Sequence, residues 1–255
     1  MSALRARCPA CRTFTAVAVG PSYECHACGR EYAAGLVRVP RAWGAEGEAM
    51  AQGAFLPLPY PETAVVEADT LAEQTTALAS VLSERPVVLG GCCCSHVGAV
   101  RGLAARVERL GLVWLDAHGD LNTPETSPSG NLWGMPLRML LDDSVVSPAD
   151  TALVGARNLD PPEVDYLAEQ GIDDSLERAL GGVDAVYVAL DLDVLDPSEV
   201  QVFVPEPDGH GVDDVESILR EVVSRSRLSG IGVTGHLRDE RNVPVAERLL
   251  VAAGL

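Results

Sequence analysis

The chain has 255 residues, of which 47% are hydrophobic, and its formal net charge is −18. Its pI of about 4.5 disfavours binding to nucleic acid, and because all 19 basic residues are Arg, chemistry that needs a Schiff-base or P-loop lysine is excluded. No apolar stretch is long enough to span a bilayer, and no signal-peptide pattern is present. We therefore expect a cytoplasmic protein without membrane partners, made of one large domain and a small appendage.

Two CxxC pairs stand near the N-terminus, Cys8 with Cys11 and Cys25 with Cys28. This spacing is typical of a four-cysteine zinc site on two tight turns, here separated by a hairpin over residues 13–23. A pair of redox dithiols is the alternative, and His26 could replace one cysteine as a ligand. We expect residues 1–35 to form a zinc ribbon with one structural Zn²⁺. The ribbon could also bind a protein partner.

From residue 36 onward, apolar strands alternate with amphipathic helices, except for residues 41–61, which look like a surface segment. This order predicts an α/β domain over residues 36–255, a three-layer α/β/α arrangement around a mostly parallel sheet. The expected strands are 36–39, 86–89, 112–115, 151–154, 185–190 and 230–234, and the expected helices are 70–82, 95–110, 137–141, 163–170, 212–224 and 245–253.

Two acidic clusters end two of these strands: Asp116, His118 and Asp120 follow the first, and Asp191 and Asp193 the second. Side chains alternate along a strand, so each cluster can converge, and neighbouring strands would bring both together. So much buried negative charge requires cations. We expect two divalent ions, with Mn²⁺ favoured and Zn²⁺, Fe²⁺, Co²⁺ or Ni²⁺ compatible. The alternative is that these aspartates only cap loops and helices.

Four motifs resemble the arginase (ureohydrolase) family over roughly residues 36–255. They are Leu115–Pro124, Ser129–Pro136, Ala156–Pro161 and Leu190–Pro197. The resemblance implies that Asp116 and Asp191 bridge two metal ions and that Asp120 binds the first ion only. It implies that His118 and Asp193 bind the second ion only.

The same resemblance implies contacts to an amino-acid substrate. Asn122 and Ser129 fall on positions that bind its carboxylate, with Asn131 close by, and Asp160 falls on the residue that receives its α-amino group, with Glu163 one helical turn further on. This set favours an arginine-like amino acid over a decarboxylated amine. Alternatively, Asn122 and Ser129 only satisfy turns.

Three departures from the family pattern affect the site. Cys93 stands where the family has a His metal ligand, and His96 is an alternative ligand if the turn is re-registered. Trp133 replaces a proton-shuttling His, and its indole could stack on a guanidinium or simply fill a wall. Gly235 stands where a Glu usually grips the guanidinium, and His236 could supply a replacement acid or base.

We therefore expect a dinuclear-metal hydrolase that cleaves a C–N bond of a guanidino or amidine compound. Its expected substrate is an arginine-like or Nω-hydroxyarginine-like amino acid, and its expected product is urea or hydroxyurea. The leaving group is expected to take its proton from Asp120 or from solvent. The alternative is a catalytically silent arginase-like binding module whose zinc ribbon mediates assembly. Relatives in the family are usually homo-oligomers, so the resemblance implies one here.

Overall fold

The computed structural model describes residues 5–255, so the first four residues of the predicted ribbon lie outside the described part. The main body is built on a seven-stranded sheet in the order β6-β5-β7-β11-β10-β8-β9, and every neighbouring pair in it is parallel. The predicted parallel α/β fold is thereby confirmed. The strands are β5 (Leu36–Val39), β6 (Glu62–Val65), β7 (Val87–Gly90), β8 (Leu110–Leu115), β9 (Thr151–Val154), β10 (Ala185–Asp191) and β11 (Leu228–Thr234).

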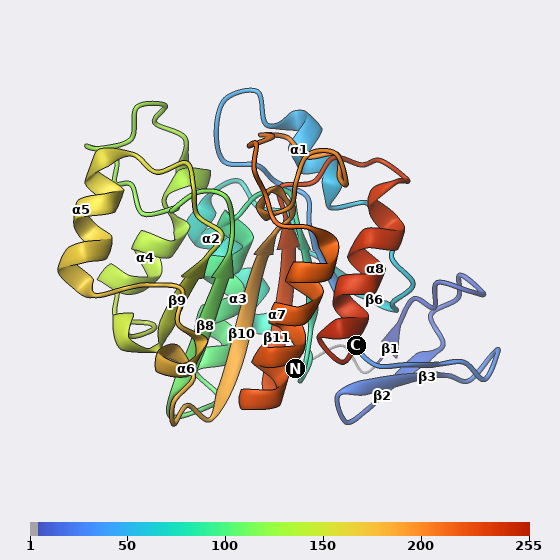
Figure 1. The fold of residues 1–255 in the computed structure, drawn as a ribbon. Helices are drawn as coiled ribbons and strands as arrows, with labels where there is room; N and C mark the ends of the chain where they lie inside the picture. The colour runs from blue at the N-terminus through green and yellow to red at the C-terminus, as the bar shows by residue number, and fades with distance from the viewer. Residues whose placement is uncertain (1–4) are drawn as a thin grey trace.

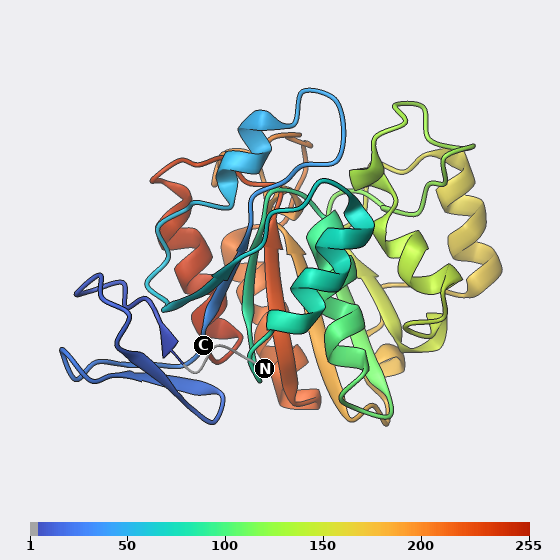
Figure 2. The ribbon, with the colours of Figure 1, turned by 180° about the vertical axis from the view of Figure 1, so that it is seen from behind.

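Helices cover both faces of this sheet, as Figures 1 and 2 show from opposite sides. One buried cluster joins the sheet to α2 (Leu71–Val81), α3 (Cys94–Ala104), α4 (Pro136–Asp142) and α5 (Pro161–Gln170). The other joins it to α6 (Leu176–Ala179), α7 (Val212–Arg225) and α8 (Asn242–Ala252). The central strands are buried at every residue, which explains why β8 and most of β10 show apolar runs instead of alternating apolar and polar residues.

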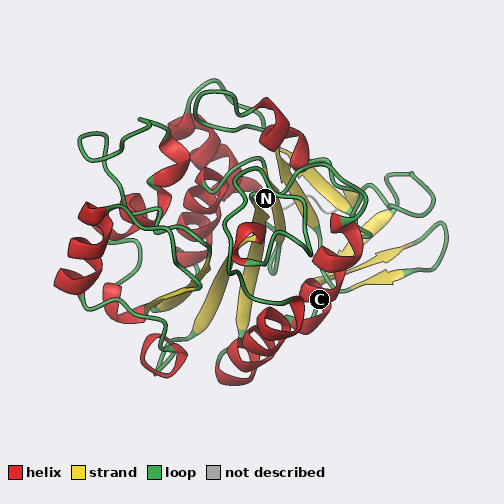
Figure 3. Ribbon diagram, turned by 45° about the horizontal axis from the view of Figure 1, so that its top comes forward, coloured by secondary structure: helices red, strands yellow, loops and turns green. Residues whose placement is uncertain are grey.

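The loops after the strands gather with α1 (Glu48–Gly53) at the carboxyl end of the sheet, at the top of Figure 1 and facing the viewer in Figure 3. Three 3₁₀ turns, Leu132–Gly134, Pro148–Asp150 and Leu192–Val194, complete the body. Within residues 5–255, none of the helices has the length and apolar composition that crossing a bilayer requires.

Two sequence predictions about elements were wrong. Residues 41–61 are not merely a surface segment, because they contain α1 and bury Met50, Leu56 and Tyr60. The helix expected over 95–110 ends at Ala104, and Leu110 begins β8, where it pairs with Ala185 of β10. Leu110 fits the helical period, so the pattern alone could not separate the last helical turn from the first strand residue.

The N-terminal residues form a separate antiparallel sheet of β1 (Arg5–Ala6), β2 (Ala16–Val19), β3 (Ser22–Cys25) and β4 (Glu31–Tyr32). The pair β2–β3 is the hairpin predicted between the two CxxC motifs. Arg7 exchanges two backbone hydrogen bonds with Glu62, of 2.8 and 3.0 Å, so this small sheet lies against the outer edge of β6.

Candidate metal centre

The strands that carry the two acidic clusters are neighbours. Leu115 of β8 pairs with Leu190 of β10, so Asp116 and Asp191 leave the sheet side by side. Asp191 also pairs with Thr234 at the end of β11. The parallel topology thus brings the clusters to one edge, as the sequence predicts.

The side chains within each acidic cluster converge for a different reason from the one we expected. A turn after each strand brings them together, and not the alternation of side chains along a strand. Asp116 Oδ1 accepts a 2.8 Å hydrogen bond from the backbone N–H of His118, and Asp191 Oδ1 accepts one of 2.9 Å from Asp193. Each aspartate therefore turns the chain back on itself immediately after the strand, as Asx turns do. A bond of 3.0 Å from the Ala117 N–H to Asp193 Oδ1 ties the two turns together.

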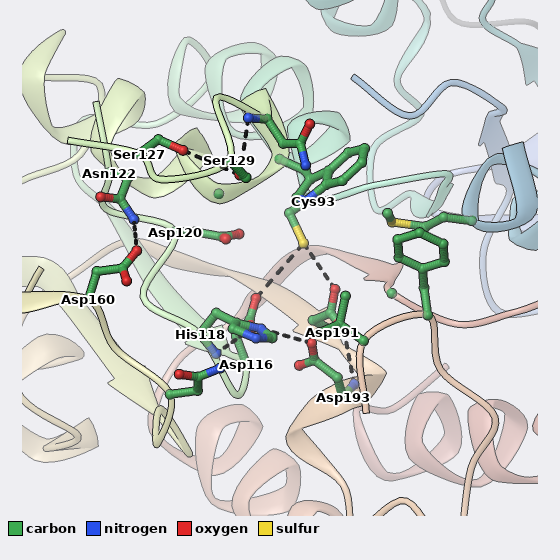
Figure 4. A pocket seen from close by; sticks show the side chains of 18 of the residues that line it. Cys93, Asp116, His118, Asp120, Asn122, Ser127, Ser129, Asp160, Asp191 and Asp193 are labelled. Carbon is green, nitrogen blue, oxygen red and sulfur yellow. Dashed lines mark hydrogen bonds and ion pairs between the residues drawn. The ribbon is translucent and has the colours of Figure 1, made fainter. Parts of the chain in front are cut away.

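The result is two groups of potential metal ligands that share Asp116, drawn in Figure 4. Cys93, Asp116 and Asp191 form one, and Asp116, His118 and Asp193 the other; within each, the ligand atoms lie within 4.8 Å of one another. Cys93 Sγ lies 3.0 Å from Asp191 Oδ2 and 3.8 Å from Asp116 Oδ2. His118 Nδ1 lies 3.0 Å from Asp193 Oδ2 and 3.4 Å from Asp116 Oδ1.

Asp120 lies outside these two groups but lines the same cavity. Its backbone adopts φ 52°, an uncommon conformation for a residue with a side chain, and its Oδ2 is buried without a hydrogen-bond partner. A buried carboxylate oxygen without a partner is costly unless a cation or proton satisfies it. In Figure 4 the side chain lies between the Asn122–Asp160 pair and Cys93.

The electrostatics of the cluster fit cations. Burial, together with the charge of Asp193, raises the pKa of Asp191 to about 7, and burial together with Asp116 raises the pKa of Asp193 to about 6. Burial lowers the pKa of His118, but its hydrogen bonds to Asp116 and Asp193 outweigh this and raise it to about 12. The donor set of carboxylates, one imidazole and one thiol fits divalent transition metals, which would neutralise this charge.

Of the two candidate ligands after the Gly90–Gly91 turn, Cys93 lines the cavity and belongs to a group of potential ligands. His96 lies on α3 with both ring nitrogens engaged away from the cavity: Nδ1 lies 3.0 Å from Tyr187 Oη, and Nε2 lies 3.2 Å from Thr234 Oγ1. The alternative register with His96 as ligand is therefore not supported.

The cavity beside the ligands has a volume of about 420 Å³. One part of its wall is polar and comes from the loop over 122–131 and the start of α5, with Asn122, Ser127, Ser129, Asn131, Asn158 and Asp160. Asn122 Nδ2 donates a 2.8 Å hydrogen bond to Asp160 Oδ2, which joins the two segments. Ser129 Oγ accepts from the Asn131 N–H at 3.2 Å. Another part of the wall is apolar, with Met50, Trp133, Phe203 and Val204.

Glu163 lines the cavity but is engaged with the backbone. Its Oε1 accepts from the Leu121 N–H and its Oε2 from the Asp160 N–H, both at 2.9 Å. It therefore holds the loop that carries Asp120 and Asn122 against the start of α5. Both of its carboxylate oxygens thus accept backbone N–H groups, and its contact with a substrate stays a prediction.

The three departures from the family pattern have distinct structural settings. The Trp133 ring packs edge-on against Phe203, with ring centroids 6.0 Å apart, inside the apolar wall. Gly235 has φ +71°, and a Cβ built there would lie 1.8 Å from Asp191 Oδ1, so no side chain fits. His236 is fully buried outside the lining, 3.2 Å from the Thr234 carbonyl oxygen and 2.9 Å from that of Gly53. His236 therefore does not line the cavity in which the predicted acid or base would act.

The four N-terminal cysteines form a further group of potential ligands, with all four sulfurs within 4.8 Å of one another. Cys8 Sγ lies 3.8 Å from Cys28 Sγ, and Cys11 Sγ lies 3.6 Å from Cys25 Sγ. Tetrahedral coordination with Zn–S bonds of about 2.3 Å places sulfurs about 3.8 Å apart, so the cluster fits one Zn²⁺. A hydrogen bond from Thr15 lowers the pKa of Cys25 to about 6, which favours the thiolate.

Sequence reasoning missed several residues of the site. Glu206 Oε1 lies 3.4 Å from His118 Nε2 and accepts a 2.7 Å bond from Asn158 Nδ2. Thr234 contacts both Asp191 and Cys93. Neither had a signal in the sequence, because Glu206 lies in an irregular loop and Thr234 looks like an ordinary strand residue.

Residues 50–234 match the family model described as "Arginase family". The chain belongs to the arginase family. An arginase from Staphylococcus aureus (strain COL) is 37% identical over 150 residues, which are 48% of this chain and 50% of that protein. The chain thus spans about half the length of the curated relatives it matches.

Two solved structures share the fold of this chain. The arginase of Bacillus cereus has a TM-score of 0.75 at 25% identity and covers 86% of this chain and 96% of its own. The proclavaminate amidino hydrolase of Streptomyces clavuligerus has a TM-score of 0.69 at 20% identity, covering 86% of this chain and 90% of its own. The family resemblance of the four motifs is thereby confirmed, while the ribbon precedes the matched residues.

Proposed function

We propose that this arginase-family chain is a metal-dependent hydrolase that cleaves a C–N bond in a guanidino or amidine compound. The observation that carries the proposal is the pair of ligand groups sharing Asp116 in one buried cavity. Relatives named arginase and amidino hydrolase support it.

Two divalent ions fit this site. Asp116, His118 and Asp193 offer oxygen and imidazole ligands, which suit Mn²⁺, whereas the thiol of Cys93 favours Zn²⁺, Fe²⁺ or Co²⁺ beside it. Asp191 belongs to the Cys93 group, and Asp120 would complete a ligand set with its unpartnered oxygen. When bound, such ions lower the pKa of a water molecule and polarise the group to be attacked.

Around this centre, the protein's own residues hold the substrate and move a proton. Asp120 lines the cavity, and the carboxylate oxygen that does not bind an ion can pass a proton to the departing nitrogen. The polar wall with Asn122, Ser129 and Asp160 suits the charged end of an amino acid, with Asn131 beside it.

The part of the cavity for the reacting end of the substrate differs from that of an arginine-binding site. Such a site has a Glu at the end of the last strand, where this chain has Gly235. Because Gly235 leaves no room for a side chain, an acidic group cannot pair with the guanidinium from this position. Trp133 and Phe203 offer ring faces and edges there instead. This favours a less basic compound, and we propose an Nω-hydroxyarginine-like amino acid ahead of arginine, with hydroxyurea or urea as the product.

The reaction is tested by a substrate screen on metal-loaded protein. We expect urea-type product from Nω-hydroxyarginine in preference to arginine, guanidinobutyrate and agmatine, and no turnover by Asp116→Asn. Preferred turnover of the decarboxylated compounds would contradict the roles of Asn122, Ser129 and Asp160. A lack of turnover of any guanidino or amidine compound by protein with full metal content would instead indicate a binding module.

Replacing Asp120 separates proton transfer from metal binding. The Asp120→Asn variant keeps an oxygen for an ion but lacks the charge and cannot carry the proton. We therefore expect weaker metal binding and, with metal added to saturation, turnover lower by roughly 10²–10⁴-fold. Asp174→Asn, at an exposed position outside the cavity, is the matched control and should retain full activity. Full turnover of Asp120→Asn at saturating metal would show that Asp120 acts only as a ligand.

We also propose a reducing, cytoplasmic setting and a homo-oligomer. All seven cysteines are free, which suits thiolate ligands and a reducing compartment. The oligomer rests on the family resemblance, and sedimentation of the purified protein tests it.

A further inference from the structure

We propose that a buried chain of three side chains, Tyr187, His96 and Thr234, positions Asp191 and Cys93 for the ion that these two ligands share. The inference rests on the metal centre of the proposed function and extends it to residues that touch neither substrate nor metal. Tyr187, His96 and Thr234 each have no exposed surface.

The three side chains form a continuous path to one carboxylate oxygen. Tyr187 Oη lies 3.0 Å from His96 Nδ1, and His96 Nε2 lies 3.2 Å from Thr234 Oγ1. Thr234 Oγ1 donates to Asp191 Oδ2 at 3.1 Å and also lies 3.4 Å from Cys93 Sγ. The last member of the chain therefore contacts both ligands.

The directions of these hydrogen bonds follow from the number of protons available. Thr234 has one hydroxyl proton, which goes to the Asp191 carboxylate, so its oxygen must accept from His96 Nε2–H. A neutral imidazole with its proton on Nε2 can only accept at Nδ1, where the Tyr187 hydroxyl donates. Burial keeps His96 neutral by lowering its pKa to about 3. Every donor along the path thus points toward Asp191.

The surrounding backbone leaves space for the side chains of Tyr187 and His96. A Cβ built on Gly232 would lie 2.3 Å from Tyr187 Oη and 2.5 Å from His96 Nδ1, so the strand must carry glycine here. The His96 ring is also packed edge-on against Trp114, with centroids 5.0 Å apart. These contacts fix the imidazole in one orientation.

Trp114 fixes Asp116, the aspartate that both ligand groups share, in a similar way. Its indole Nε1 donates to Asp116 Oδ2 at 3.2 Å. Two carboxylate oxygens face Cys93, namely Oδ2 of Asp116 and Oδ2 of Asp191. Trp114 fixes the first and Thr234 the second, both from the α3 side of the sheet. Partners of this kind orient metal ligands, and their removal typically costs metal affinity.

The experiment uses the full-length protein loaded with Co²⁺ alone. The charge-transfer absorption of a Cys93 thiolate on Co²⁺ is isolated by subtracting the spectrum of Cys93→Ser, in which the ribbon signal is unchanged. Competition with a chelator, followed at this absorption, gives the affinity. We expect Thr234→Val to weaken Co²⁺ binding by about 10–100-fold and to shift the absorption, with a smaller loss in Tyr187→Phe. Thr234→Ser, which keeps the hydroxyl, should restore most of the affinity.

Thr151→Val is the matched control, because Thr151 is also a fully buried strand residue whose hydroxyl donates a hydrogen bond, here to the Ser147 carbonyl at 2.9 Å. It should lose stability without a change in Co²⁺ affinity. Unaltered affinity and absorption in both Thr234→Val and Tyr187→Phe would overturn the inference while leaving the metal centre intact. No Cys93-dependent absorption in the parent protein would overturn the metal centre, and the inference with it.

Discussion

At the residue scale, each aspartate that ends a strand divides its two oxygens between two tasks. Oδ1 of Asp116 and of Asp191 accepts a backbone N–H two residues further on, while Oδ2 of each faces Cys93. One side chain thus shapes the turn and also offers a ligand atom. An Asn could still form the turn but would lack the charge that attracts a cation, so folding and metal binding can be separated at these positions.

Gly235 offers a test of how closely the backbone is fitted to this site. Gly235→Ala should lose bound metal, because the new Cβ would collide with the Asp191 carboxylate at a backbone φ of +71°. Gly171→Ala is the control, since Gly171 has φ +66° and open space around it. Both variants should lose roughly 1–2 kcal/mol from the left-handed conformation, but metal analysis should show depletion only in Gly235→Ala. Equal metal content in both would contradict the steric argument.

The convergence of the candidate ligands could be predicted from the sequence, whereas the residues behind them could not. Asp116, His118, Asp191 and Asp193 stand out because charged residues directly follow buried strands. His96 contacts partners that lie 91 and 138 residues away, and no local pattern encodes such contacts. Its placement depends on the packing of α3 against the sheet.

At the element scale, Arg38 connects three segments that the sequence does not show to be close. From β5, its Nε donates to Glu62 Oε2 on β6 at 2.7 Å, and its Nη1 donates to the carbonyls of Ala54 and Leu56. It therefore holds the chain after α1 against the sheet. This charged residue inside β5 gave no sequence signal of that role, and β6 itself was not predicted because its residues are only half-buried.

Removing this buried arginine should cost far more stability than removing an exposed one. We expect Arg38→Met to lower the free energy of unfolding by about 3 kcal/mol, because it leaves Glu62 and two carbonyls without a partner. Arg225→Met breaks an exposed pair with Glu221 and should cost less than about 0.5 kcal/mol. Urea unfolding measures both values, and similar losses would contradict the role assigned to Arg38.

The ribbon is an element whose own core is small. Apart from its cysteines, the buried residues of this core are Ala6, Ala16 and Tyr23. Metal binding should therefore supply most of its folding energy. Cys28→Ser should lose one Zn²⁺ per chain and expose residues 5–35 to limited proteolysis, while the body stays folded. A ribbon that resists proteolysis without zinc would refute this, and Ser22→Ala, outside the four-thiol cluster, is the control.

At the scale of the whole molecule, the acidic cluster links metal binding to overall stability. Three central strands, β8, β10 and β11, end at the cluster, so ions that neutralise its carboxylates should stabilise the middle of the sheet. Mn²⁺ at about 100 times its Kd should stabilise the fold by about 2.7 kcal/mol. Calorimetry should show a higher Tm for the parent chain and a much smaller shift for Asp116→Asn. An equal Tm shift in the parent chain and in Asp116→Asn would show that Mn²⁺ stabilises the protein at another site.

The backbone bonds between Arg7 and Glu62 have a consequence for solubility. A strand at the border of a sheet presents unpaired N–H and C=O groups that can recruit a strand from another molecule. The N-terminal appendage covers this border of β6 at Glu62, while Val65 at the other end of the strand is 45% exposed. We therefore expect that removal of zinc first causes molecules to associate through the edge of β6, and that the main body unfolds only later.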